Sequence, residues 1–148
     1  MVDKSIVGTV MGTTVFPIER GKIREFATAI LDDNPHYQEE AAPIIPPTFS
    51  MTQAFWPRKT DGPPPNLGLN YARVLHGEQE FEYLAPIRAG DTITGTTRVT
   101  DVYEKEGKRG GTMAFVVIET DWRNQDDQAV LVTRQVLLET SKPATEGS

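Results

Sequence analysis

The stretch that most constrains the fold lies between Leu31 and Pro57 and reads LDDNPHYQEEAAPIIPPTFSMTQAFWP. It begins with a polar loop that carries two carboxylates, an Asn-Pro pair and a histidine, and it continues into a proline-rich segment. Pro46 and Pro47 indicate a helix start, because proline has a φ that suits the first helical turn and lacks an N–H that this turn does not need. The segment Pro47–Trp56 is apolar almost all round, which is typical of a buried helix.

Strand patterns fill the chain after Gly68. Alternating or β-branched residues predict four strands, at Tyr71–Leu84, Thr92–Tyr103, Thr112–Trp122 and Ala129–Thr140. We expect a hairpin turn at Glu106–Gly111, a stiff proline-rich loop at 58–68, and loose ends at 1–8 and 141–148.

Two further elements precede the polar loop. Thr13–Ile18 predicts an edge strand or a short strand, since Pro17 has no N–H to donate to a neighbour. Glu19–Leu31 predicts a helix whose buried face repeats at i, i+3, i+4, i+7 and i+8. The residues of that face are Ile23, Phe26, Ala27, Ile30 and Leu31.

Together these elements predict an α+β protein with one antiparallel sheet wrapped around one buried helix. We expect a single domain over residues 1–148, with its core at about 10–140. A single curled sheet leaves an edge strand unpaired, so we also expect two such sheets to associate as a dimer.

Charge and composition exclude several classes of function. The net charge is −6 and no long basic run occurs, which argues against a dedicated nucleic-acid binder. No apolar run is long enough to cross a membrane, and the chain shows no signal-peptide pattern. The absence of cysteine excludes disulfides, thiolate metal sites and a cysteine nucleophile. We therefore expect a cytoplasmic protein that needs no metal or other cofactor.

The polar loop is the candidate chemical site. Five polar residues lie together just before the apolar segment, namely Asp32, Asp33, Asn34, His36 and Glu39. A carboxylate beside an imidazole suits acid–base chemistry on a water molecule. The same residues also fit a simple helix-terminating turn with solvated side chains. His76 is the other histidine, and two histidines this far apart make a weak metal site.

Three motifs resemble a known family. ILDDNPHY, the PPTF helix start and LHGEQEFEYLAPIRAGD together resemble the MaoC-like, FAS1-like dehydratase N-terminal domain, over about residues 10 to 140. The resemblance implies a hot-dog fold, packed as a double hot-dog dimer. It also implies chemistry on acyl thioesters of coenzyme A or acyl carrier protein, either hydration of a trans-2-enoyl group or dehydration of a (3R)-hydroxyacyl group.

The catalytic pattern of that family is altered in this chain. Catalytic members carry Asp, one residue, Asn-Pro, one residue, His, which places Asp32 and Asn34 on the pattern but Tyr37 at the histidine position. His36 lies one residue early. Catalytic members also begin the central helix with His-Gly, whose N–H polarises the thioester carbonyl, whereas this helix begins with Pro46-Pro47.

The resemblance is therefore to the non-catalytic subunit of a heterodimeric (3R)-hydroxyacyl-thioester dehydratase, which binds substrate beside a catalytic MaoC-like partner. Two alternatives remain: a homodimeric enoyl-CoA hydratase that uses Asp32 with His36 or His76, and a protein that only binds acyl thioesters. Asp32 and His36 are the candidate catalytic residues. The candidate substrate-binding residues are Asn34, Tyr37, Thr48, Phe49, Ala54 and His76.

Overall fold

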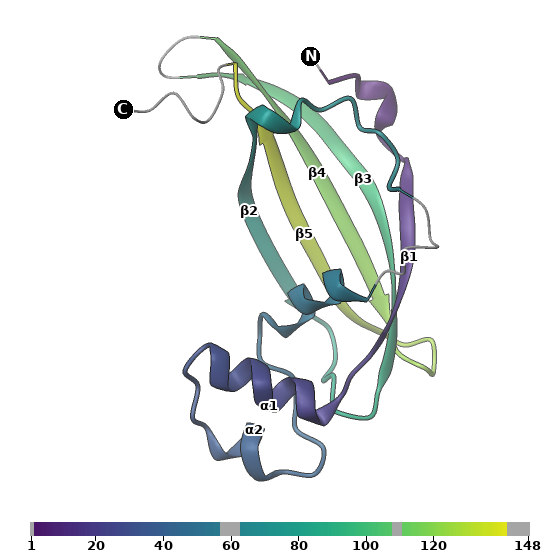
Figure 1. Ribbon diagram of the computed structural model, residues 1–148. Helices are drawn as coiled ribbons and strands as arrows, with labels where there is room; N and C mark the ends of the chain where they lie inside the picture. The colour runs from purple at the N-terminus through teal and green to yellow at the C-terminus, as the bar shows by residue number, and fades with distance from the viewer. Residues whose placement is uncertain (1, 57–62, 108–110, 142–148) are drawn as a thin grey trace.

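The computed structural model describes residues 2–56, 63–107 and 111–141 (Figure 1). Five strands form one antiparallel sheet in the order β1-β3-β4-β5-β2, so β1 and β2 are the edges. The strands are β1 (Val10–Pro17), β2 (Val74–Tyr83), β3 (Thr92–Glu106), β4 (Thr112–Arg123) and β5 (Ala129–Glu139). The edge position predicted for the first strand is confirmed.

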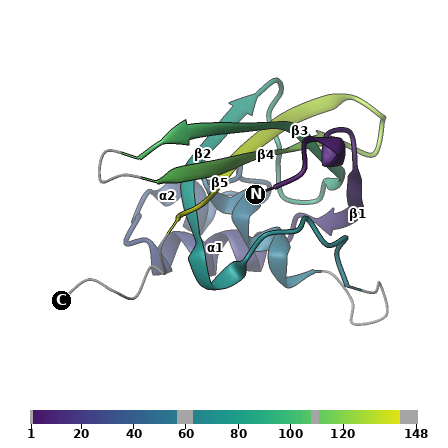
Figure 2. The same cartoon turned by 90° about the horizontal axis from the view of Figure 1, so that it is seen from above.

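Short helical segments complete the structure, and seen from above α1 and α2 lie on one side of the sheet (Figure 2). The α-helices are α1 (Arg20–Ala29) and α2 (Pro35–Glu39). The 3₁₀ helices are η1 (Lys4–Ile6), η2 (Phe49–Phe55) and η4 (Tyr71–Arg73). Within the described residues, no helix is long and apolar enough to cross a membrane.

The face of the sheet toward η2 carries two apolar clusters. Alternate residues of a strand share a face, so Ala114, Val116, Ile118 and Trp122 of β4 all point to this side, and all are buried. The cluster nearest the helices is Phe16, Ile18, Ile23, Ile45, Phe49, Ile87, Ile93, Trp122, Val130 and Leu131. The cluster at the other end is Val2, Leu67, Leu69, Val99, Val102, Ala114, Val116 and Ile118.

The segment η2 differs from the predicted buried helix at Pro47–Trp56. It is a 3₁₀ helix, in which only Phe49 and Ser50 are buried and Phe55 is 89% exposed. Side chains three residues apart eclipse one another in a 3₁₀ helix, so Phe55 lies in the same row as Phe49, but two turns further on, where that row has left the core. The prediction of a helix buried all round is therefore wrong.

The end of α1 also differs from its prediction. The helix was expected to bury Ile30 and Leu31, but Ile30 is its C-cap and Leu31 is 90% exposed. Leu31 has a φ of 60°, and its N–H donates to the Thr28 oxygen while the Asp32 N–H donates to the Ala27 oxygen. This is a Schellman helix ending with leucine at the position that usually holds glycine.

The expected loose N-terminus is folded across residues 2–8. Val2 is buried in the second apolar cluster, and the Gly8 N–H donates to the Val99 oxygen. The expected strand from Tyr71 begins instead at Val74, after η4. Three other predictions fall partly outside the described residues. These are the turn at Glu106–Gly111 at residues 108–110, the proline-rich loop at residues 58–62, and the C-terminal tail at residues 142–148.

Candidate functional site

Local hydrogen bonds shape the polar loop after α1. The Asp32 carboxylate accepts a bond from the Asn34 N–H at 3.1 Å, and the Asn34 side chain accepts one from the His36 N–H at 3.0 Å. Asn34 thereby caps α2, and Pro35 occupies its first turn. The Asp-x-Asn-Pro sequence therefore builds a turn between two helices, and that turn holds Asp32 half-buried.

Both ring nitrogens of His36 have partners. Nε2 accepts a hydrogen bond from the Ile44 N–H at 2.9 Å, and Nδ1 lies 2.8 Å from Oε1 of Glu40. A ring nitrogen that accepts from a backbone N–H carries no proton, so these partners assign the proton of the neutral ring to Nδ1. The Nδ1–H then donates to the Glu40 carboxylate. His36 thus fastens α2 to the segment before η2.

Two tyrosines lie near this loop and are held as neutral phenols. Burial, reinforced by the negative charge of Asp32, raises the pKa of Tyr37. Burial raises the pKa of Tyr83 to about 12; the Ser50 hydroxyl opposes this shift and Tyr37 adds to it. The Tyr83 hydroxyl donates to the Pro47 oxygen at 2.7 Å. The loop, the end of β2 and the start of η2 therefore meet in one polar cluster.

The other predicted site residues are placed differently. Thr48 is the exposed N-cap of η2, Phe49 is fully buried in the core, and Ala54 is exposed. His76 lies at a bulge near the start of β2, seven residues from Tyr83, which corresponds to roughly 20 Å along a strand. The loop thus collects Asp32, Asn34, His36 and Tyr37, but not His76.

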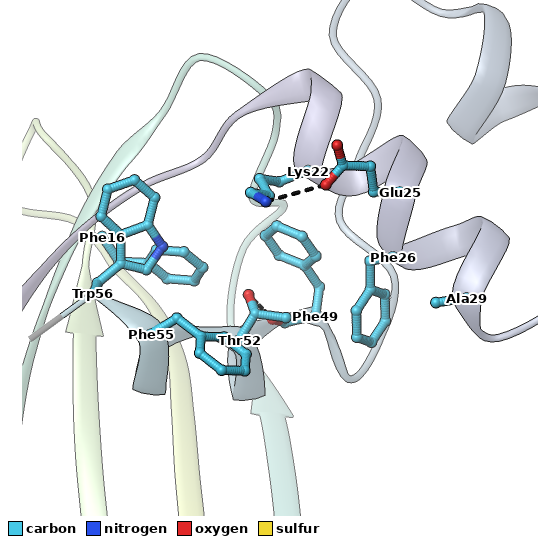
Figure 3. A pocket seen from close by; sticks show the side chains of 9 residues that line it. All are labelled: Phe16, Lys22, Glu25, Phe26, Ala29, Phe49, Thr52, Phe55 and Trp56. Carbon is cyan, nitrogen blue, oxygen red and sulfur yellow. Dashed lines mark hydrogen bonds and ion pairs between the residues drawn. The ribbon is translucent and has the colours of Figure 1, made fainter.

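An apolar groove of about 400 Å³ lies between α1 and η2 (Figure 3). Its lining consists mainly of aromatic side chains, with the Lys22–Glu25 ion pair at its rim. The lining residues are Phe16, Lys22, Glu25, Phe26, Ala29, Phe49, Thr52, Phe55 and Trp56. Of these, only Phe49 was predicted. The missed signal is the three-residue spacing of Phe49, Thr52 and Phe55, which forms one row on a 3₁₀ helix.

Metal ligands do not gather in the described ranges, where no group of three or more His, Cys, Asp or Glu side chains could hold an ion. The polar cluster offers one carboxylate, two phenols and a buried hydroxyl. Such a set can orient water or a carbonyl by hydrogen bonds. It contains no imidazole with a free nitrogen, since His36 uses both of its own.

Comparisons with known proteins give a consistent result. The model of the FAS1-like, dehydratase domain region matches residues 5–133. A UPF0336 protein of Streptomyces coelicolor is 40% identical over 115 residues, which cover 72% of this chain and 77% of that protein. A UPF0336 protein of Saccharopolyspora erythraea is 38% identical over 146 residues, covering 93% of this chain and 90% of that protein.

Solved structures of low sequence identity share the fold. The HadBC (3R)-hydroxyacyl-ACP dehydratase complex of Mycobacterium tuberculosis matches with a TM-score of 0.67 and 22% identity, covering 90% of this chain and 96% of that chain. A MaoC-like dehydratase matches with a TM-score of 0.72 and 20% identity, covering 92% of this chain and 42% of that chain. The predicted α+β hot-dog fold is confirmed.

Proposed function

The chain belongs to the family of FAS1-like dehydratase domain regions, and from this premise we propose that it is one subunit of an enoyl-thioester hydratase or (3R)-hydroxyacyl-thioester dehydratase. In this proposal it supplies the substrate-binding half, and a MaoC-like partner subunit supplies the catalytic carboxylate and imidazole. The substrate is an acyl thioester of coenzyme A or acyl carrier protein.

The engagement of His36 is the observation that carries the proposal. Hydration of an enoyl thioester needs a group that takes a proton from water and a group that delivers a proton to the carbon chain. An imidazole does this with a free nitrogen, and His36 has none because Ile44 and Glu40 occupy both. Tyr37, at the histidine position of the catalytic pattern, is a phenol that is protonated near neutral pH, and burial and Asp32 raise its pKa further.

The start of η2 gives independent support. A thioester carbonyl is polarised in catalytic relatives by a free N–H at a helix start, which is worth several kcal/mol, on the order of 3. Pro46 and Pro47 have no N–H to give, and the Phe49 N–H already donates to the Pro46 oxygen at 3.0 Å. This helix start is therefore poorly equipped to stabilise a developing negative charge.

The groove between α1 and η2 suits the binding role. Its phenylalanine side chains provide apolar surface that an acyl chain would remove from water, at about 25 cal/mol for each Å² buried. A binding subunit needs this surface and does not need an acid–base pair. The edge strand β2 is solvent-exposed over most of its length, so it can pair with a second hot-dog subunit.

Turnover of crotonyl-coenzyme A tests the proposal. We expect no hydration by the purified chain alone, and hydration when a MaoC-like subunit with the intact Asp and His pattern is added. Turnover by the chain alone would favour the homodimeric hydratase. Thioester binding without turnover in either sample would favour a protein that only binds acyl groups.

Variants of the polar loop sharpen this test. In the partnered complex, Asp32→Asn is expected to change the rate by less than about threefold, whereas loss of a general acid or base reduces it by about 10²–10⁴-fold. His36→Ala should act mainly on stability, since it leaves the Ile44 N–H without its acceptor. A hundredfold loss for Asp32→Asn in the purified homodimer would overturn the proposal.

A further inference from the structure

A second hollow lies on the other side of η2, against the sheet. Its volume is about 80 Å³, and it is separate from the apolar groove. Ser50 and Gln53 form the row of η2 that lines this cavity, while Phe49, Thr52 and Phe55 form the row that lines the groove. The complete lining is Ser50, Met51, Gln53, Gln79, Thr97, Ile118, Thr120, Trp122, Thr133 and Gln135.

The sheet supplies a polar band at this point. Thr97 pairs with Thr120 and Thr120 with Thr133, so three threonines lie side by side across β3, β4 and β5. Gln135 and Gln79 are paired neighbours one step along β5 and β2. On either side of this band the same face of the sheet is apolar, formed by the two clusters described above. The band is thus a local change of polarity inside the core.

Some of these groups satisfy one another and two do not. The Thr97 and Thr120 hydroxyls are 2.8 Å apart, and the Trp122 indole N–H donates to the Thr133 hydroxyl at 3.3 Å. The Gln79 side-chain oxygen is buried without a hydrogen-bond partner among the described residues. The Ser50 hydroxyl is also buried and makes no hydrogen bond of ordinary geometry there, although it lies close enough to the Tyr83 phenol to oppose the rise in its pKa. Each such group costs about as much as a lost hydrogen bond.

The chemistry of the lining defines what fits. A cavity needs at least about 10–15 Å³ to hold one water molecule, so this one has room for several waters or for a polar group of a few atoms. No side chain that lines it is charged, so a carboxylate, phosphate or ammonium group would be buried there without a counter-ion. Hydroxyl and amide side chains both donate and accept, which suits a neutral oxygen-bearing group.

We propose that this cavity binds a further oxygen-bearing group, a hydroxyl or carbonyl that lies beyond C3 on the acyl chain of the thioester, an identification of the ligand that rests on the proposed function. Ser50 connects the two regions, because its hydroxyl lies beside Tyr83 and also lines the cavity. A chain that passes the polar loop and then Ser50 enters the cavity. Unsubstituted alkyl chains fit the apolar groove on the other side of η2, so η2 separates two pockets of opposite polarity.

Binding of decanoyl-coenzyme A and of hydroxydecanoyl-coenzyme A positional isomers tests the inference, measured by calorimetry on the chain alone and with its partner subunit. We expect the best isomer with its hydroxyl beyond C3 to bind about tenfold more tightly than either decanoyl-coenzyme A or the 3-hydroxy isomer, as one or two added hydrogen bonds imply. Ser50→Ala and Gln79→Leu should each bring this ratio toward one. Ser5→Ala, a hydroxyl deletion on exposed η1, should leave it unchanged.

The Trp122 indole N–H provides a local reporter. Its NMR signal is expected to shift with the hydroxylated isomer and not with decanoyl-coenzyme A, since the indole donates to a threonine of the cavity. Equal affinities for all esters would mean that water alone fills the cavity. That result would overturn the inference and leave the proposed function standing. Failure of every ester to bind, with or without the partner, would overturn the proposed function and the inference together.

Discussion

Two phenylalanines of η2 give a direct measure of how this segment packs. Phe49 is 0% exposed, stacks on Phe16 with ring centroids 5.7 Å apart, and meets the edge of Phe26 at 5.6 Å. Phe49→Ala removes both ring contacts and leaves a cavity, so we expect it to lower the free energy of unfolding by about 3–5 kcal/mol. For a chain of this size, 1 kcal/mol corresponds to roughly 2–4 °C in Tm, which makes the expected shift about 6–20 °C.

Phe55→Ala is the matched control, because it makes the same change two turns later in the same helix. Phe55 is 89% exposed, so the expected loss is within about 0.5 kcal/mol. Both variants would be unfolded in urea at several protein concentrations. A loss for Phe55→Ala that grows with concentration would report an oligomer contact, whereas equal concentration-independent losses would contradict the packing of η2 described above.

Three further predictions concern other parts of the molecule. Gly95→Ala should lower the free energy of unfolding by about 1–3 kcal/mol, because a Cβ at Gly95 would lie 2.6 Å from the Trp122 ring. An unchanged midpoint of urea unfolding would refute this close approach. The Tyr83 phenol should ionise near pH 12 in an absorbance titration, and stability should fall between pH 10 and 12 because the unfolded tyrosine, with a pKa of 10.0, loses its proton first. Tyr83→Phe should lack that loss. Sedimentation should give a mass of twice 16.4 kDa, or the mass of a heterodimer when the partner is present. A monomer whose mass does not change when the partner is added would count against association through β2.

The strands were predictable because their signal is local. β4 contains the apolar and β-branched run Met113–Ile118 and β5 contains the run Ala129–Thr133, and such runs are visible in the sequence without any tertiary knowledge. The predicted ends differ from the observed ones by at most three residues, and the predicted starts of β3, β4 and β5 coincide with the observed ones. The end of α1 was less predictable, because the helical spacing continues through Leu31 although the backbone at Leu31 turns left-handed.

The role of His36 could not be read from local pattern. Its two partners are the backbone of Ile44, eight residues later, and the carboxylate of Glu40. Whether a histidine in such a loop is free or engaged depends on how the chain returns after α2. That return is held by backbone hydrogen bonds from the Ile45 N–H to the Ile87 oxygen and from the Ala89 N–H to the Pro43 oxygen. Sequence spacing supplied the cluster of candidate residues, whereas tertiary contacts decide which of them has a free functional group.

The pitch of η2 connects the fold to the site. In an α-helix of about 3.6 residues per turn, Phe49 and Gln53 would share a face, so aromatic and polar side chains would mix on one surface. At three residues per turn the same residues separate into an aromatic row toward α1 and a polar row toward the sheet. The short helix therefore separates the apolar groove from the polar cavity. It has little helical dipole to offer a thioester carbonyl, so the proposed function requires the catalytic helix start to come from a partner subunit.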